Sequence, residues 1–385
     1  MQPGSRCVVI GAGILGASVA VRLAAAGMRV TLLDQDQPGR GTSRWSFAWA
    51  NSNDKGPRAY HDLNHAGLRA WAELAPRLDG AAWYRPVGHV EFAADGAELA
   101  ARVERLTSCG YPARLIGAGE AAELEPALLP PEGQATAAWF PGEAYLLTEP
   151  LIARLVADLT RRGGTLLTGE PGRVTGLDAG PGGTALVRTA AGAEIEAGQV
   201  VCCAGRWTPA LAALAGAAGT VPLVPWDTPG SPAPELVVRA GPVGPEGPAR
   251  VIHTPRIALR PHQGGLLHLE ASGRLADLHT PEAELRRMAA EFLDRARQTV
   301  RGLDEAHVVA ARVCVRPLPA DELSIVGRLP GAGWLYVAVT HSGVTLAAHL
   351  SRLIVAELTT GTEAAELTPY RPARFAGTAA PTTGR

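Results

Sequence analysis

The feature that most constrains this chain is a glycine-rich turn between a short apolar strand and an amphipathic helix. Residues 6–10 form a short strand that is apolar after Arg6, and the run Gly11-Ala12-Gly13-Ile14-Leu15-Gly16 follows them directly. Apolar side chains then recur at helical spacing through residues 14–26, and Gly27 ends that pattern. Residues 29–33 read as a second strand, so the opening of the chain predicts a β-α-β unit in a parallel sheet.

In such a unit each glycine has a mechanical task. Gly11 permits the tight turn, Gly13 lets a pyrophosphate approach the backbone, and Gly16 lets the helix pack closely on the strand. The N–H groups at the helix start then face the phosphates. Asp34 ends the second strand, where it is placed to accept ribose hydroxyls, and Asp36 is the alternative. An acid here argues against NADP, but it does not separate NAD from FAD.

Bulk properties exclude several classes of protein. A length of 385 residues exceeds one ordinary domain and favours two. The 36 basic and 37 acidic residues nearly cancel and form no long basic run, so nucleic acid is not expected as a partner. Glycines and Arg22 interrupt the apolar N-terminal stretch, so neither a membrane span nor a signal peptide is expected, which predicts a cytoplasmic protein. The five cysteines lack metal-ligand spacing, so neither zinc nor disulfides are expected.

The hydrophobic pattern changes along the chain from buried strands and helices to alternating strands, and it later returns to the first type. Residues 149–161 and 342–358 read as helices, and 199–203 and 334–339 as apolar strands, whereas 251–259 and 266–270 alternate in period two. We therefore predict an α/β fold with a discontinuous Rossmann-like domain and a second, α+β substrate domain built on an antiparallel sheet. The first domain is expected to comprise residues 1–84, 143–217 and 308–371, the second 85–142 and 218–307, with a flexible tail at 372–385.

Four segments, in this order, resemble the D-amino-acid oxidase-like family of flavoproteins, which includes glycine oxidase and sarcosine oxidase. They are the opening β-α-β unit and residues 41–46, 201–207 and 316–343. The resemblance covers nearly the whole chain, but it is not specific for a substrate. It implies a two-domain fold in which FAD lies across the nucleotide domain and its isoalloxazine ring faces a pocket under the substrate domain.

The resemblance also implies which residues hold the cofactor. The segment that wraps the flavin matches residues 42–46, with loop-capping hydroxyls as the alternative. The last helix matches one that points at the flavin pyrimidine edge, where reduction gathers negative charge. FAD is expected to be non-covalent, with a covalent link through Cys314 as the alternative. The expected cofactor residues are Gly11, Gly13, Ile14, Leu15, Gly16, Asp34, Gln35, Thr42, Ser43, Ser46, Val174, Ala204, Gly205, Trp207, Ser342, Gly343, Val344 and Thr345.

Four residues are expected at the reacting centre. Arg316 matches the family position that clamps a substrate carboxylate, with a structural arginine as the alternative. His341 precedes the last helix and either adds a donor, touches substrate or caps that helix. Trp49 and Lys55, the only lysine, follow the flavin-wrapping segment, with a solvated loop as the alternative. The sequence Asp321-Glu322-Leu323-Ser324 departs from the family's usual Asp-Gly-Leu-Pro, which puts the local turn in doubt.

The function that the resemblance implies is oxidation of a C–N bond in a small amine or amino acid. A hydride passes from the carbon beside an uncharged amine to flavin N5, water hydrolyses the resulting imine, and oxygen or another acceptor takes up the electrons. Two alternatives are an NAD-dependent dehydrogenase built on the same glycine turn and a non-catalytic subunit of a heteromeric flavoprotein. Substrate identity and oligomeric state do not follow from the sequence.

Overall fold

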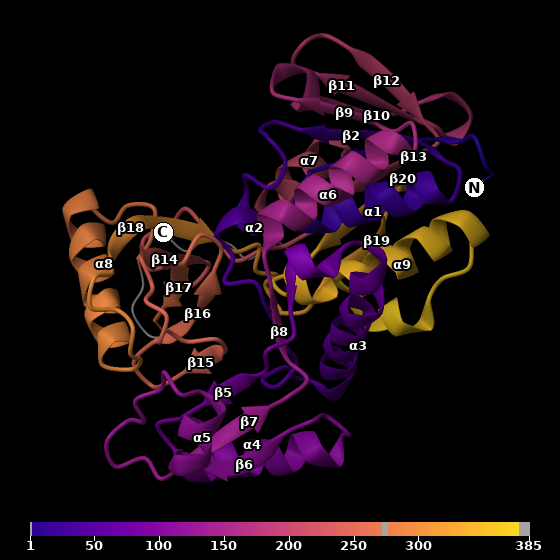
Figure 1. Cartoon of the computed structure of the whole chain (residues 1–385). Coiled ribbons are helices and arrows are strands. Elements are labelled where there is room, and N and C mark those ends of the chain that lie inside the picture. Colours follow the sequence, from indigo (N-terminus) through magenta and orange to yellow (C-terminus); the bar gives the residue numbers. More distant parts are fainter. Residues whose placement is uncertain (1, 272–275, 377–385) are drawn as a thin grey trace. The chain divides into compact units, whose positions relative to one another are not determined.

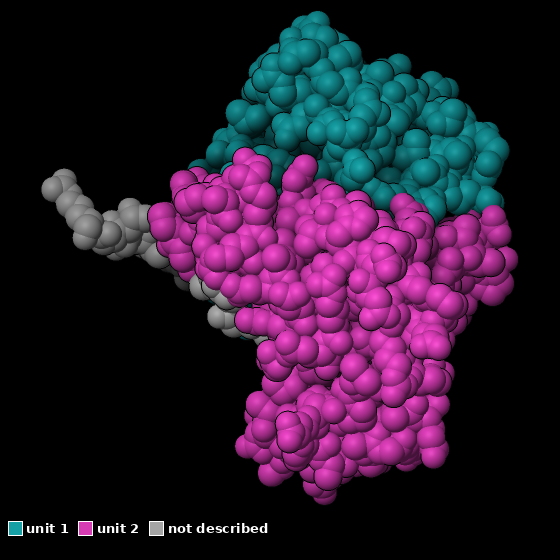
Figure 2. Space-filling view, turned by 60° about the vertical axis from the view of Figure 1, so that its left-hand side comes forward, with its two compact units in different colours: residues 1–44, 148–226, 316–385 teal, residues 45–147, 227–315 magenta. Residues whose placement is uncertain are grey.

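The computed structural model describes residues 2–271 and 276–376, and backbone contacts divide the chain into two compact units (Figures 1 and 2). Unit 1 comprises Met1–Arg44, Thr148–Trp226 and Arg316–Arg385, and unit 2 comprises Trp45–Leu147 and Asp227–Val315. The chain thus leaves unit 1 well before the boundary expected at residue 84, because residues 45–84 contribute strands and a helix to unit 2.

Unit 1 contains a six-stranded sheet that is parallel except at one edge (Figure 1). β1 pairs in parallel with β2 on one side and β13 on the other, β9 and β20 continue the parallel sheet outwards, and β19 is antiparallel to β20. The sheet is drawn from all three segments of unit 1, which explains why the predicted domain is discontinuous. In spatial order the strands are β19 (Ile325–Leu329), β20 (Ala332–Val339), β13 (Gln199–Cys202), β1 (Arg6–Ile10), β2 (Arg29–Asp34) and β9 (Thr165–Thr168).

Helix α1 (Ile14–Ala25) packs against α6 (Thr148–Arg161) and α9 (Gly343–Thr360). Close packing needs glycine at two points. A Cβ on Gly16 would collide with the Gly11 carbonyl, and a Cβ on Gly11, whose φ is +99°, would lie 2.6 Å from the Cys203 carbonyl oxygen. A small antiparallel sheet and a short helix complete this part of the unit: β10 (Val174–Ala179), β11 (Ala185–Thr189), β12 (Glu194–Ala197) and α7 (Thr208–Leu214).

Unit 2 is built on an eight-stranded sheet, and the expectation of an antiparallel sheet is confirmed at every pair except β15 with β5, which is parallel. The single strand expected at residues 251–259 is wrong. The chain turns at Thr254, whose N–H donates to the Ile257 carbonyl and whose Oγ1 accepts from the N–H of Arg256. In spatial order the strands are β18 (His307–Val315), β14 (Pro234–Gly241), β17 (Leu266–Glu270), β16 (Ala258–His262), β15 (Val251–His253), β5 (His89–Glu91), β7 (Thr136–Phe140) and β6 (Arg114–Gly117).

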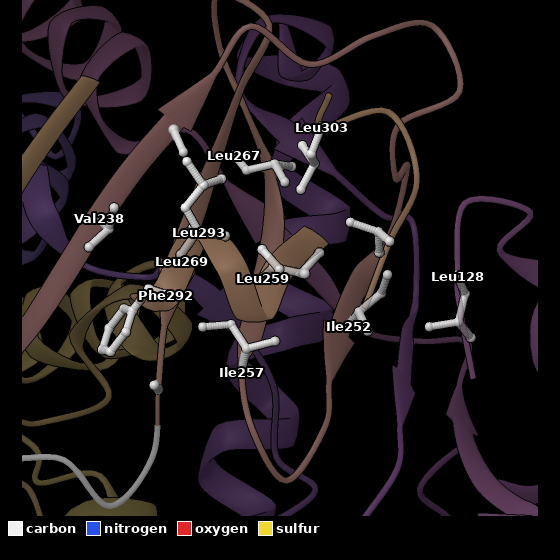
Figure 3. Packing of buried hydrophobic residues seen from close by; sticks show 14 of the residues in the cluster. Leu128, Val238, Ile252, Ile257, Leu259, Leu267, Leu269, Phe292, Leu293 and Leu303 are labelled. Atoms are coloured by element: carbon white, nitrogen blue, oxygen red, sulfur yellow. The ribbon is translucent and has the colours of Figure 1, made fainter. Parts of the chain in front are cut away.

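One face of this sheet forms the apolar core of unit 2. Figure 3 shows Val238, Leu259 and Leu269 from the strands packed with Phe292 and Leu293 of α8 (Glu282–Arg297). Since side chains alternate along a strand, the residues between these core positions point to the opposite face. The other elements of unit 2 are β3 (Trp49–Ala50), α3 (Arg58–Leu74), β4 (Tyr84–Arg85), α4 (Gly96–Ser108), α5 (Ala118–Leu124) and β8 (Ala144–Leu146). No helix within the described ranges is both long and apolar enough to cross a membrane.

The expected flexible tail at 372–385 is wrong for its first residues, and 377–385 lie outside the described residues. Pro372–Phe375 form a short 3-10 helix that contacts β19. Arg374 pairs with Asp321 through both carboxylate oxygens, at 2.8 and 3.1 Å, and donates to the Leu323 carbonyl at 3.1 Å. This bidentate ion pair fixes the segment to the turn that follows β18.

That turn has a left-handed residue where the sequence departs from the family pattern. Glu322 has φ +64°, the region in which a side chain clashes with the following backbone. Its N–H donates to the Pro319 carbonyl at 2.9 Å, and Asp321 Oδ1 accepts from the Leu323 N–H at 3.2 Å. A glycine at this position would adopt this φ without strain, so the turn forms here at a cost that Arg374 helps to offset.

We predict that Glu322→Gly raises the free energy of unfolding by about 1 kcal/mol, because glycine removes the left-handed strain. Denaturant unfolding of both proteins measures the difference. Glu322→Ala is the control, since alanine keeps a Cβ at the strained φ and should give no comparable gain. Equal stabilisation by both variants would show that the strain is not the cause.

Candidate functional site

The glycine turn lies at the carboxyl edge of the unit 1 sheet. The Gly11 N–H donates to the Leu33 carbonyl at the end of β2, and the Cys203 N–H donates to the Ile10 carbonyl, each at 2.7 Å. The turn is therefore held between the ends of β2 and β13, and α1 begins directly after it. The carboxyl edge of a parallel sheet is where such folds bind nucleotides.

The start of α1 is arranged for an anion. A Cβ on Gly13 would meet only Ser43 Oγ, at 3.1 Å, so this side of the turn lets a ligand approach the backbone. Ser43 Oγ also accepts from the Ile14 N–H at 3.1 Å. The segment carrying Ser43 is fastened to α6 by the Thr148 hydroxyl, which donates to the Ser43 carbonyl at 2.7 Å, and by the 2.7 Å ion pair of Arg44 with Glu149. Helix dipole, backbone N–H groups and a hydroxyl thus converge here.

Asp34 stabilises the glycine turn, in addition to its expected role of accepting ribose hydroxyls. Its Oδ2 accepts from the Ala12 N–H at 2.6 Å and its Oδ1 from the Asp36 N–H at 2.9 Å, so it ties the glycine turn to the end of β2. Burial raises the pKa of the Asp34 carboxyl, and the two backbone donors oppose that shift. Each oxygen keeps lone-pair capacity for a ribose hydroxyl. Asp36 and Gln35 are exposed beside it.

Three more segments of unit 1 meet at this edge. A Cβ on Gly41 would lie 3.5 Å from the Trp207 ring, and a Cβ on Gly205, whose φ is +55°, would lie 3.9 Å from Pro317. Arg316, next to Pro317, is half-buried. On the β2 side, a Cβ on Gly172 would collide with the Asp34 carbonyl, which places the turn before Val174 beside Asp34. The expected residues 41–43, 172–174, 204–207 and 316 are thereby brought together around one sheet.

Helix α9 starts at the same edge because it follows β20, which is parallel to β13. Ser342 is the N-cap residue, and its own side chain makes no capping hydrogen bond to the helix. The Ser342 N–H instead donates to Thr340 Oγ1 at 3.1 Å, and that oxygen also accepts from the Ser324 hydroxyl at 2.8 Å. His341 is half-buried and directly precedes the N-cap residue. The positive end of an 18-residue helix therefore lies among the expected cofactor residues Ser342 to Thr345.

Three predicted residues, Ser46, Trp49 and Lys55, lie in unit 2. Ser46 Oγ accepts from the N–H of Ala48, which has φ +57°. Trp49 is half-buried, and its indole N–H donates to Glu143 Oε2 at 2.7 Å, so it is not part of a solvated loop. Lys55 lies between β3 and α3 and is half-buried.

Sequence reasoning missed a row of charged and polar side chains on the sheet of unit 2, opposite its apolar core. We call this row the polar face; it comprises Arg239, His268, Arg260, His253 and His89 from five neighbouring strands. Arg260 is 2% exposed and His268 is fully buried. The signal in the sequence was the alternation of arginine or histidine with apolar residues in β16 and β17, a pattern that ordinarily marks a strand with one face in water.

Arg260 sets the protonation state of its neighbours. It donates to the carbonyls of Phe47 and Pro261, and its Nη2 lies 3.3 Å from His268 Nδ1. A guanidinium has no acceptor, so His268 must accept at Nδ1 and carry its proton on Nε2. Burial, together with the charge of Arg260, lowers the pKa of His262 to about 3 and that of His268 well below its usual value. Burial also lowers the pKa of Arg260 to about 10, so near neutral pH the charge here resides on the arginines.

Comparisons with known proteins agree with this architecture. The curated oxidoreductase YurR of Bacillus subtilis (strain 168), described as uncharacterized, is 26% identical over 95% of this chain and 98% of its own length. Glycine oxidase of Geobacillus kaustophilus (strain HTA426) is 26% identical over 96% of this chain and 97% of its own. The crystal structure of L-proline dehydrogenase from P. horikoshii superposes with a TM-score of 0.82 at 20% identity, covering 98% of this chain and 99% of that one.

The glycine oxidase crystal structure from Geobacillus kaustophilus superposes with a TM-score of 0.80, covering 96% of this chain and 99% of that chain at 22% identity. These structural likenesses show the fold, which confirms the expected Rossmann-like domain joined to a second domain. The family model described as DAO, FAD dependent oxidoreductase, matches residues 6–357. Because that match spans most of the chain and includes the glycine turn, Asp34 and the start of α9, this protein belongs to the DAO family of FAD-dependent oxidoreductases.

Proposed function

We propose that this protein oxidises a C–N bond in a small amine or amino acid, in keeping with the glycine oxidase and L-proline dehydrogenase to which it is similar. The observation that carries the proposal is the convergence of two helix starts, α1 and α9, with Asp34 at one sheet edge. The N-terminus of α1 suits a diphosphate, and the N-terminus of α9 suits the negative charge of a reduced flavin ring. A single extended FAD molecule would use both.

The residues present fit FAD. Gly13 leaves the backbone of the α1 start open to the diphosphate, Ser43 adds a hydroxyl beside it, and Asp34 offers acceptors to the adenosine ribose. The start of α9 would present its dipole to the pyrimidine edge of a bound flavin. When bound, FAD supplies the two-electron acceptor, and the chain's own part is to bind, orient and exclude water.

Substrate binding is proposed to depend on Arg316 of unit 1. Arg316 is proposed to clamp a substrate carboxylate, because a planar guanidinium binds both carboxylate oxygens and so orients the Cα hydrogen. His341, Trp49 and Lys55 are proposed to line the reacting centre. The electron acceptor is proposed to be oxygen or another electron acceptor.

The purified protein is expected to be yellow, and a matching amine should bleach it without air. The measurement is loss of flavin absorbance on anaerobic addition of glycine, L-proline, sarcosine and simple secondary amines, followed by readmission of oxygen. Recovery of colour with oxygen marks an oxidase, and recovery only with an added acceptor marks a dehydrogenase. A colourless protein that binds NAD instead, or a yellow protein that no amine bleaches, would contradict the proposal.

Arg316→Gln is expected to raise KM for amino acids by about 10- to 100-fold, the effect of losing charge-assisted hydrogen bonds worth about 1.5–3 kcal/mol. Amines that lack a carboxylate should be affected little. Arg316→Lys serves as the matched control, since it keeps the charge but loses the bidentate fork and should fall between the two. Equal losses for both substrate classes would identify Arg316 as a structural arginine.

FAD is proposed to be held without a covalent bond. Acid precipitation of the holoprotein should therefore leave the flavin in the supernatant. Cys314 is buried near the end of β18 and is the alternative attachment point. Flavin that stays in the pellet of the native protein, but is released from Cys314→Ser, would establish the covalent link.

A further inference from the structure

The loop of residues 39–44 in unit 1 is bonded near both of its ends to the glycine turn and the start of α1. The Gly39 N–H donates to the Ala12 carbonyl at 2.9 Å, and Ser43 Oγ accepts from the Ile14 N–H at 3.1 Å. We call these residues the 39–44 loop. Its Ser43 hydroxyl therefore lies beside the backbone that would receive the diphosphate.

The start of helix α6 packs against the 39–44 loop. The Thr148 hydroxyl donates to the Ser43 carbonyl at 2.7 Å, and a Cβ on Gly39 would lie 3.1 Å from Ile152 Cδ1. Thr148 and Ile152 are about one helical turn apart and share a face of α6. Thr148 is 6% exposed, so water competes little for its hydrogen bond. The hydroxyl at this helix end thus fixes the residue whose own hydroxyl meets the start of α1.

An ion pair adds a second tie beside this hydrogen bond. Arg44 Nε lies 2.7 Å from Glu149 Oε1, and the two side chains are 39% and 29% exposed. A partly exposed pair contributes modestly and weakens in salt, which a buried hydrogen bond between neutral groups does not. The two ties join the last residues before the chain leaves unit 1 to the first residues after it returns.

We propose that Thr148 and Glu149 are positioning residues for FAD that act through the 39–44 loop. With Ser43 fixed, its hydroxyl and the start of α1 are arranged before the cofactor arrives, so binding costs less conformational freedom. When the loop is released, only a fraction of the molecules is ready to bind, and the affinity falls by that fraction. This inference rests on the FAD site of the proposed function and not on the substrate that is oxidised.

The release of FAD from the holoprotein tests the hydrogen bond. Flavin fluorescence after dilution measures the release rate without turnover. Thr148→Val keeps the branched shape but loses the hydroxyl, and it should release FAD about 3- to 10-fold faster, the effect of one hydrogen bond. Thr148→Ser keeps the donor and should restore a rate close to the native one. Native release from Thr148→Val, or equally fast release from both variants, would overturn the role of Thr148.

Glu149→Gln gives a test in which charge and position predict opposite signs. By charge alone, removing an acid favours an anionic ligand and slows its release. Loss of the tie to Arg44 instead predicts release about 2- to 5-fold faster, with the ratio to the native rate approaching one at high salt. The ratio for Thr148→Val should change little with salt. Slower release from Glu149→Gln would contradict its positioning role.

Asp158→Asn is the matched control, because it removes an ion pair with Arg161 nearer the other end of the same helix. It should release FAD at the native rate, and faster release from it as well would overturn a specific role of the two residues at the helix start. Hydrogen exchange of the holoprotein gives a second readout. Exchange in the peptide that covers residues 39–46 should rise in Thr148→Val and Glu149→Gln and stay native in Asp158→Asn.

These measurements separate the inference from the proposed function, because neither needs a substrate. A protein that shows this pattern of FAD release but oxidises no amine would contradict the proposed function alone. Amine oxidation together with native release rates in Thr148→Val and Glu149→Gln would contradict the positioning role alone.

Discussion

Everything in unit 1 depends on the main-chain hydrogen bonds that fasten the glycine turn between neighbouring strand ends. Gly11 is bonded to the end of β2, Cys203 to the end of β1, and Asp34 reaches back to Ala12. These bonds bring together residues that are far apart in sequence, because β13 comes from a later segment of the chain than β1 and β2. The absent side chains at Gly11 and Gly16 are what allow the approach.

Unit 2 uses the two faces of one sheet for opposite purposes. The face towards α8 is a dry apolar core, whereas the other face buries arginines, histidines and, close by, the Glu143 carboxylate. Burying ionisable groups is costly for stability, so their gathering on one surface is typical of a functional site. The segment 46–49 lies over this face, fixed by Arg260 at the Phe47 carbonyl and by Glu143 at the Trp49 indole.

Much of the fold could be predicted from local sequence, and the predictions that were wrong failed for physical reasons. The β-α-β unit and the later returns of the chain to the first domain were predictable. Apolar strands, glycine turns and helical periodicity can all be recognised from short stretches of sequence. The polar face was not, since an alternating strand looks the same whether its polar side meets water or a buried site. The turn at Thr254 divided one expected strand, and a bidentate ion pair from Arg374 ordered residues expected to be flexible. The boundary near residue 44 was missed because β3 is only two residues long.

The order of segments within the two units has a consequence for how the chain is made. The path changes unit at 44/45, 147/148, 226/227 and 315/316, and β20, which completes the parallel part of the first sheet beside β13, comes after the last change. On the ribosome the first β-α-β unit must therefore wait for β13 until the middle of the chain is made, and for β20 and α9 until nearly the whole polypeptide has emerged. Neither unit corresponds to a single uninterrupted stretch of coding sequence, so neither can be excised by simple truncation.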